Sequence, residues 1–191
     1  MKFPALLAVA ALASILAFGA HAEVRPVAEF AVIKISKSLI EPPQYNFSGA
    51  QPYDVDLRAR WLQVEVEFAA APEFTDELTV KYYVLIGGKL LTGEVTHVRL
   101  FAGRELRSVM YLPPDAFARA LGNRLPSANT VDNVAVQLVH GSALASELSL
   151  ERAAPQWFAT LPPVRGFLLN KNETPFAPLY WDRYAQIKSP R

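Results

Sequence analysis

Histidine and cysteine, the side chains that most often carry catalysis or hold metals, are scarce in this chain. It has 191 residues, no cysteine and three histidines, of which His97 and His140 follow residue 22. No HxH or HExxH spacing occurs, so no metal site is predicted, and thiol nucleophiles are excluded. GxSxG, SxxK and glycine-rich phosphate loops are also missing. A hydrolase would need His97 or His140 as its base, beside a nucleophile that nothing marks. We therefore expect no enzyme activity and no cofactor.

Two pairs of carboxylates have spacings that could do chemistry. Glu65 and Glu67 project from one face of a predicted strand, whereas a glycosidase needs two carboxyls facing each other, roughly 5–10 Å apart. We expect these two to be solvated on an open sheet face. Asp54 and Asp56 resemble part of a calcium loop, but the glycine and the distal glutamate of such a loop are missing, so no metal is expected there.

Aromatic residues and prolines are concentrated in residues 168–184, LLNKNETPFAPLYWDRY. Each large side chain, if buried, would contribute about 1.5–3 kcal/mol. Three roles stay open: a strap over the protein's own sheet, a contact with a partner, and a platform on which sugars stack. The candidate contact residues are Phe176, Tyr180, Trp181 and Tyr184. The candidate sugar platforms are Trp61, Trp157, Tyr180 and Trp181.

The elements that must position these residues are strands. Apolar and polar patterning predicts strands at 28–36, 60–68, 77–86, 89–101, 104–112, 133–139 and 143–150. Gly87-Gly88 has the form of a two-residue hairpin turn, and Ala102-Gly103 predicts the next turn. Residues 143–150 also suit a helix, although a strand gives residues 133–139 their hairpin partner. Residues 164–170 predict an eighth strand at an edge.

One helix is predicted at 113–123, with Pro114 in its first turn and Gly122 as its cap. The pattern as a whole predicts an all-β chain: an immunoglobulin-like antiparallel β-sandwich with one short helix and a proline- and aromatic-rich C-terminal extension. A barrel or a jelly roll stays open. We expect the sandwich to span residues 23–151 and the extension, packed on it, to span residues 152–191.

The first 22 residues have the pattern of a secretory signal peptide. One lysine precedes an apolar run that ends in Ala20-His21-Ala22, an A-x-A-like cleavage site. The run is too short to span a bilayer, so no membrane span is expected after cleavage. Beyond residue 22 the 18 acidic residues are matched by equally many basic ones, so no nucleic-acid partner is expected. We expect an exported protein of the periplasm, the cell surface or the medium.

The closing stretch NKNETPFAPLYWDRY, together with the signal pattern and the strands, resembles a family of small exported proteins encoded among type IV pilus genes in Verrucomicrobia, including Akkermansia. This resemblance implies an immunoglobulin-like sandwich at the periplasm or cell surface, with a role in pilus assembly or host contact, and it brings no catalytic residues. We expect a non-enzymatic accessory, assembly or interaction protein. Its expected partners are proteins of the cell envelope or pilus machinery, or a second copy in a homo-oligomer, bound by strand addition at a sheet edge. A carbohydrate- or ligand-binding sandwich module is the alternative.

Overall fold

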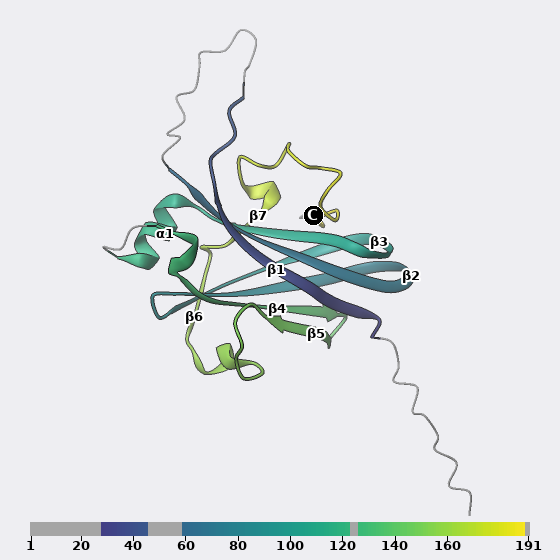
Figure 1. The fold of residues 1–191 in the computed structure, drawn as a ribbon. Coiled ribbons are helices and arrows are strands. Elements are labelled where there is room, and N and C mark those ends of the chain that lie inside the picture. The colour runs from purple at the N-terminus through teal and green to yellow at the C-terminus, as the bar shows by residue number, and fades with distance from the viewer. Residues whose placement is uncertain (1–27, 46–58, 123–125, 190–191) are drawn as a thin grey trace, which may run out of the picture.

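The computed structural model describes residues 28–45, 59–122 and 126–189 (Figure 1). In chain order the elements are β1 (Phe30–Ile40), β2 (Trp61–Ile86), β3 (Lys89–Leu112), α1 (Pro114–Leu121), η1 (Ala128–Thr130), β4 (Val131–His140), β5 (Ala143–Ser149), η2 (Trp157–Thr160), β6 (Pro163–Arg165), β7 (Leu169–Asn170) and η3 (Lys171–Glu173). The η elements are short 3₁₀ turns. Strands dominate, which confirms the all-β class.

Most of the sheet is built on two long strands that run side by side. β2 and β3 pair antiparallel from Leu62 opposite Leu112 at one end to Ile86 opposite Lys89 at the hairpin. The strand order is β5-β4-β2-β3-β6, with β1 on β2 and β7 on β3. The first part of β2 therefore lies between β1 and β3, and its last part lies between β4 and β3.

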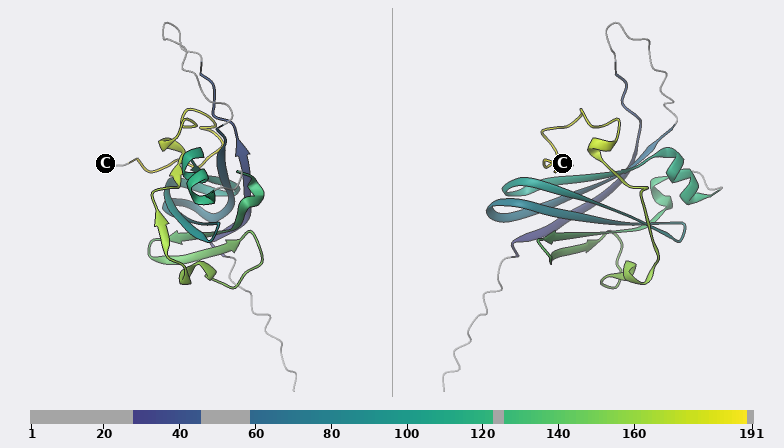
Figure 2. Two further views of the ribbon diagram at one scale, coloured as in Figure 1. Left: turned by 90° about the vertical axis from the view of Figure 1, so that its left-hand side faces the viewer. Right: turned by 180° about the vertical axis from the view of Figure 1, so that it is seen from behind.

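The long pair is bent in its middle, so that a single sheet folds over into two arms (Figure 2). The register between β2 and β3 shifts from Phe68 to Ala70 and again from Ala70 to Phe74. The turn predicted at Ala102-Gly103 is wrong, because both residues lie inside β3 and Gly103 pairs with Ala70 at the shift. A bulge interrupts the alternation of a strand much as a turn does, and the sequence pattern does not separate the two.

The two arms of the folded sheet enclose the core. Side chains alternate across a strand, so every second residue of each arm faces inward. The inward residues with no exposed surface include Leu62, Val64, Val66 and Phe68 of the first arm and Val80, Tyr82, Val84 and Ile86 of the second. This confirms the alternation predicted for residues 60–68 and 77–86, and it is consistent with a β-sandwich.

The predicted hairpin and helix are both confirmed. Gly87 and Gly88 have φ of 57° and 75°, the left-handed conformation that a two-residue hairpin requires. In α1 the buried side chains of Phe117 and Leu121 lie one turn apart and pack on the core. Gly122 follows with φ of 66° and ends the helix where the sequence predicted. Residues 143–149 form a strand, as preferred.

After β5 the chain wraps around the outside of the sheet. The ring of Phe158 in η2 stacks on Tyr83 of β2, with centroids 3.7 Å apart. Tyr83 points away from the core, because its two neighbours in β2 face inward. The chain then passes along β3 as β6 and β7, so the predicted eighth strand is split into two short pieces. Residues 171–187 cover the outer face of the other arm (Figure 2). The division of the chain at residue 151 stays a prediction.

Two predictions concern segments outside the described residues: the signal peptide at residues 1–22 and the Asp54–Asp56 pair. Within the described ranges, every helix is too short and too polar to cross a membrane. The His, Asp and Glu residues of those same ranges include no group of three that could hold a metal ion.

Candidate functional site

One buried aromatic ring fixes the extension to the outer face of the sheet. Phe176 is 2% exposed and stacks on Tyr111 of β3, with ring centroids 4.6 Å apart and planes 13° apart. Trp61 of β2 meets the same ring edge-on, at 5.6 Å between centroids. Aromatic pairs of these kinds contribute about 0.5–1.5 kcal/mol each beyond the burial of their area. Phe176 is therefore an anchor of the extension.

A compact turn precedes this anchor and sets its direction. The Asn170 side chain accepts a hydrogen bond from the backbone N–H of Asn172 at 2.9 Å, and the Glu173 carboxylate accepts one from the N–H of Asn170 at 2.8 Å. This reciprocal capping satisfies the free N–H groups at the start of η3. The Thr174 hydroxyl then accepts from the N–H of Phe176 at 3.2 Å. The polar residues before Phe176 thus form the turn that directs its side chain toward the sheet.

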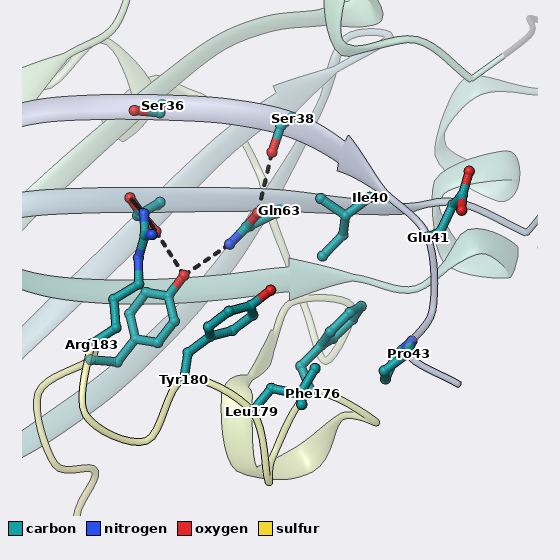
Figure 3. Close-up of a pocket in the computed structure, with 12 residues that line it drawn as sticks. Ser36, Ser38, Ile40, Glu41, Pro43, Gln63, Phe176, Leu179, Tyr180 and Arg183 are labelled. Atoms are coloured by element: carbon teal, nitrogen blue, oxygen red, sulfur yellow. Dashed lines mark hydrogen bonds and ion pairs between the residues drawn. The ribbon is translucent and has the colours of Figure 1, made fainter. Parts of the chain in front are cut away.

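A second anchor, Tyr184, enters a network of polar side chains on β1 and β2. Gln63, Ser38 and Arg183 of this network are labelled in Figure 3. Its hydroxyl donates to Oε2 of Glu65 at 2.7 Å and accepts from Nε2 of Gln63 at 3.0 Å. The Arg183 guanidinium donates to both oxygens of Glu65, at 2.8 and 3.0 Å. The Ser38 hydroxyl donates to Oε1 of Gln63 at 3.2 Å. The network joins residues more than a hundred positions apart in the sequence.

The charges in this network compensate one another. Burial by itself would raise the pKa of Glu65, but the hydrogen bonds from Arg183 and Tyr184 and the charges of Arg183 and Arg107 outweigh it and lower that pKa. Glu67, next along the same face of β2, pairs with Arg107 at 3.2 Å. Both glutamates of the predicted pair thus lie on the outer face, each in contact with an arginine. Two side chains on one face of a strand do not oppose each other across a substrate bond, which is the arrangement that glycosidases use.

The backbone of residues 185–188 ties the extension to the edge of β3. The N–H of Val98 donates to the carbonyl of Gln186 at 2.9 Å, and the N–H of Lys188 donates to the carbonyl of Thr96 at 2.8 Å. Between them, Ile187 forms an isolated antiparallel bridge with His97. Strand-like pairing of this kind covers the exposed edge of a sheet. The extension is consequently held on both sides of its exposed middle.

His97 belongs to this attachment. It is 1% exposed, with Nδ1 3.0 Å from the carbonyl oxygen of Ala185 and Nε2 2.7 Å from the Ser108 hydroxyl. The Tyr82 hydroxyl donates to Ser108 at 2.7 Å. Burial lowers the pKa of His97 to about 4, so the ring is neutral, with Nδ1 as donor to the carbonyl and Nε2 as acceptor. These contacts include no carboxylate, which a serine hydrolase would need to orient its base.

Between the anchors, two aromatic residues remain in contact with solvent. Tyr180 is 54% exposed and Trp181 is 81% exposed. Tyr180 has φ of 54°, a left-handed conformation that costs a residue with a β-carbon about 1 kcal/mol or more. Hydrogen bonds from the N–H of Leu179 to Phe176 (3.0 Å) and from the N–H of Arg183 to Tyr180 (3.2 Å) hold the loop in this shape. The exposed rings are therefore carried by a fixed loop.

A groove of about 390 Å³ lies between this loop and the outer face of the sheet (Figure 3). We call it the Tyr180 groove. Its floor is formed by Ser36, Ser38, Gln63 and Glu65, and its wall by Leu179 and Tyr180. Ser36 is the register partner of Glu65, and Ser38 that of Gln63. The four floor side chains thus point from two neighbouring strands toward the loop.

The four contact residues predicted from the sequence divide into two buried and two exposed. Phe176 and Tyr184 are buried anchors, whereas Tyr180 and Trp181 are exposed. Of the other predicted sugar platforms, Trp61 is half-buried against Phe176 and Trp157 is half-buried beside Phe158. They are packing residues in this fold. The four aromatics are brought together in one loop, but they have different roles.

Sequence reasoning missed the floor of the groove. The alternation of β2 placed Gln63 and Glu65 on the outer face, and that part is confirmed. Ser36 and Ser38 show the same alternation in β1, but nothing in the sequence indicated that β1 would pair with that part of β2. The contact of β2 with Tyr184 spans 119 positions or more and has no local signal.

Fold and extension together define the class of this protein: an all-β chain in which one folded sheet is wrapped by its own C-terminal segment. A protein-family model matches residues 22–191, and the chain belongs to that family. No curated protein matches the chain. A crystal structure of a protein from Akkermansia muciniphila superposes with a TM-score of 0.70 at 22% sequence identity, covering 85% of this chain and 94% of that one. The two matches support the Akkermansia-type resemblance, and the structural match shows the fold.

Proposed function

We propose that this chain is an immunoglobulin-like, non-enzymatic interaction protein of the cell envelope, exported and linked to type IV pili. It contacts a protein partner through the loop that carries Tyr180 and Trp181. One observation carries the proposal: Trp181 is 81% exposed, although it lies between the buried anchors Phe176 and Tyr184. The signal-peptide pattern of residues 1–22 and the resemblance of the C-terminal stretch support a location in the cell envelope.

The arrangement of the loop suits a binding hot spot. Tryptophan and tyrosine dominate the binding energy of protein interfaces, because each buries a large area with few rotatable bonds. A loop that is already fixed loses little further entropy when it binds. Here the capping turn, the left-handed Tyr180 and the β3 edge contacts provide that fixation before any partner arrives.

A site-specific photo-crosslinker tests this proposal. A benzoylphenylalanine placed at Trp181, in the full chain produced by its own organism, should yield an adduct with an envelope or pilus protein identified by mass spectrometry. The matched control is the same substitution at Phe101, which is 66% exposed and belongs to the bend of β3, outside the loop. Adducts that are equal at both positions, or none at position 181, would refute the proposed contact.

The Tyr180 groove favours a second candidate, a ligand-binding module. Its volume of about 390 Å³ lies in the range of small-molecule sites, roughly 300–1,000 Å³. It combines an exposed aromatic ring with convergent polar side chains, as such sites do. Ligand binding would use the side of the loop that faces the sheet, whereas the proposed protein contact would use Trp181.

A further inference from the structure

We propose that the Tyr180 groove binds a neutral hexopyranose, with one sugar face on the Tyr180 ring and the sugar hydroxyls on the polar floor. The inference rests on the second candidate function and gives it a ligand class. The groove lies between strands β1 and β2 and the fixed loop of the extension (Figure 3).

The floor offers hydrogen-bonding groups of the kind that sugar hydroxyls need. Ser36 and Ser38 are two residues apart on β1 and present their hydroxyls on the same face. Gln63 uses one N–H for Tyr184, and the amide has a second to donate. Among the described residues, the Ser36 and Tyr180 hydroxyls have no hydrogen-bond partner. Both can therefore donate to a ligand and accept from it.

The wall offers an aromatic surface in a fixed position. Tyr180 is half exposed beside the groove, and its left-handed backbone is maintained against a local energetic cost. Such strain persists only where the surroundings impose it, and it occurs most often at functional sites. Leu179 continues the apolar wall. A pyranose ring has one face of C–H groups, which packs on an aromatic ring as other apolar surfaces do.

The charges of the groove favour a neutral ligand over an ionic one. Glu65 is bound by Arg183 at 2.8 Å and lies 3.9 Å from Arg107. At the mouth, Glu41 pairs with Arg60 at 3.3 Å. The Glu41–Arg60 pair is exposed and costs little to break, but a charged ligand that displaced an arginine from the largely buried Glu65 would leave a charge without its partner, which is costly. A neutral polyhydroxyl ligand leaves all of them intact.

Titration of the purified, isotope-labelled chain with simple sugars tests the inference. The probes are glucose, galactose, cellobiose and lactose, with glucuronic acid as the charged comparison, followed through the amide signals of Ser36, Ser38 and Gln63. At least one neutral sugar should shift these signals saturably, with Kd of about 0.1–5 mM, typical of a small ligand with few contacts. If disaccharides bind tenfold tighter than monosaccharides, the natural ligand is part of a glycan chain. If the affinities are equal, the natural ligand is a free sugar.

Matched variants separate this site from the protein contact. Ser36→Leu fills the floor of the groove and should lower the affinity for sugar at least about tenfold. Trp181→Ala should leave the sugar affinity unchanged but should abolish binding of the protein partner found by crosslinking. If Ser36→Leu fails to fold, Tyr180→Ala replaces it as the groove variant. No saturable shift with any neutral sugar, unchanged affinity in the folded groove variant, or tighter binding of glucuronic acid would overturn the inference. None of these outcomes affects the test at Trp181.

Discussion

The buried histidine at the attachment of the extension makes the stability of this protein depend on pH. The folded-state pKa of His97 is lowered to about 4 from an ordinary value of 6.5, because burial disfavours the charged ring. A depressed pKa means that the unfolded chain binds the proton more readily, so acid favours unfolding. The contribution of His97 is complete above pH 6.5 and is lost as the pH falls toward 4.

The size of the effect follows from the gap between the two pKa values. One pKa unit corresponds to 1.36 kcal/mol, so the full loss below pH 4 is about 3 kcal/mol. At pH 5 the loss has already reached about 2 kcal/mol by the same linkage relation. A single domain has only about 5–15 kcal/mol of stability, so the change is easily measured. Glu65, whose pKa is lowered from 4.5, adds its own acid dependence as the pH falls below 4.5, which lies outside the range of pH 7 to 5.

Urea unfolding at pH 7, 6 and 5 measures the effect. Wild type should lose about 2 kcal/mol between pH 7 and pH 5, and His97→Gln should be less stable at pH 7 but lose little more on acidification. His140→Gln is the matched control, because it removes the histidine at the end of β4 and leaves His97 and its contacts in place, so the loss that comes from His97 should remain. A wild-type stability that is flat from pH 7 to 5, or a dependence that survives in His97→Gln, would refute the reasoning.

Three further substitutions test the packing of the extension and the sheet. Phe176→Ala removes the ring stacked on β3 and should cost about 3–5 kcal/mol in unfolding free energy, measured by urea titration; a loss below 1 kcal/mol would contradict its role as an anchor. Trp181→Ala, five residues on, should change the same quantity by less than about 0.5 kcal/mol, since its ring is exposed; a large loss would show that it packs. Gly93→Ala places a methyl 2.7 Å from Met110 and 2.8 Å from Leu168, and should lower the melting temperature through an overpacking cost of about 1–3 kcal/mol; an unchanged melting temperature would show that the two side chains yield freely.

The strands could be predicted because their pattern is local. Leu62, Val64 and Val66 face the core as their alternation requires, and the paired glycines at 87 and 88 form the hairpin. The sequence did not predict that β3 is one continuous strand. The two predicted strands on either side of Ala102-Gly103 are one strand, because the hydrogen-bonded ladder is interrupted at the bulge and resumes beyond it with a shifted register. Composition alone does not tell such a shift from a turn.

The site could be predicted only in part. The tail stood out because aromatics and prolines are concentrated there, and it contains both the anchors and the exposed pair. The sequence could not separate Phe176 from Trp181, because both are large apolar residues and their burial depends on which face of the loop meets Tyr111. The groove floor could not be predicted either, because Gln63 meets Tyr184 from 121 positions away in the sequence. Contacts at that range depend on tertiary packing, which local patterns do not encode.

The long reach of the extension has a consequence for the order in which the protein is made. His97 bonds to a carbonyl 88 positions further along the chain, and Tyr111 is covered by a ring that is synthesised far later than its own strand. During synthesis the outer face of β2 and β3 therefore stays bare, with an open strand edge, until the extension has been made. Partly made chains with an exposed apolar face and an unpaired strand edge tend to aggregate. This interval is therefore the one in which a chaperone could bind and cover that face.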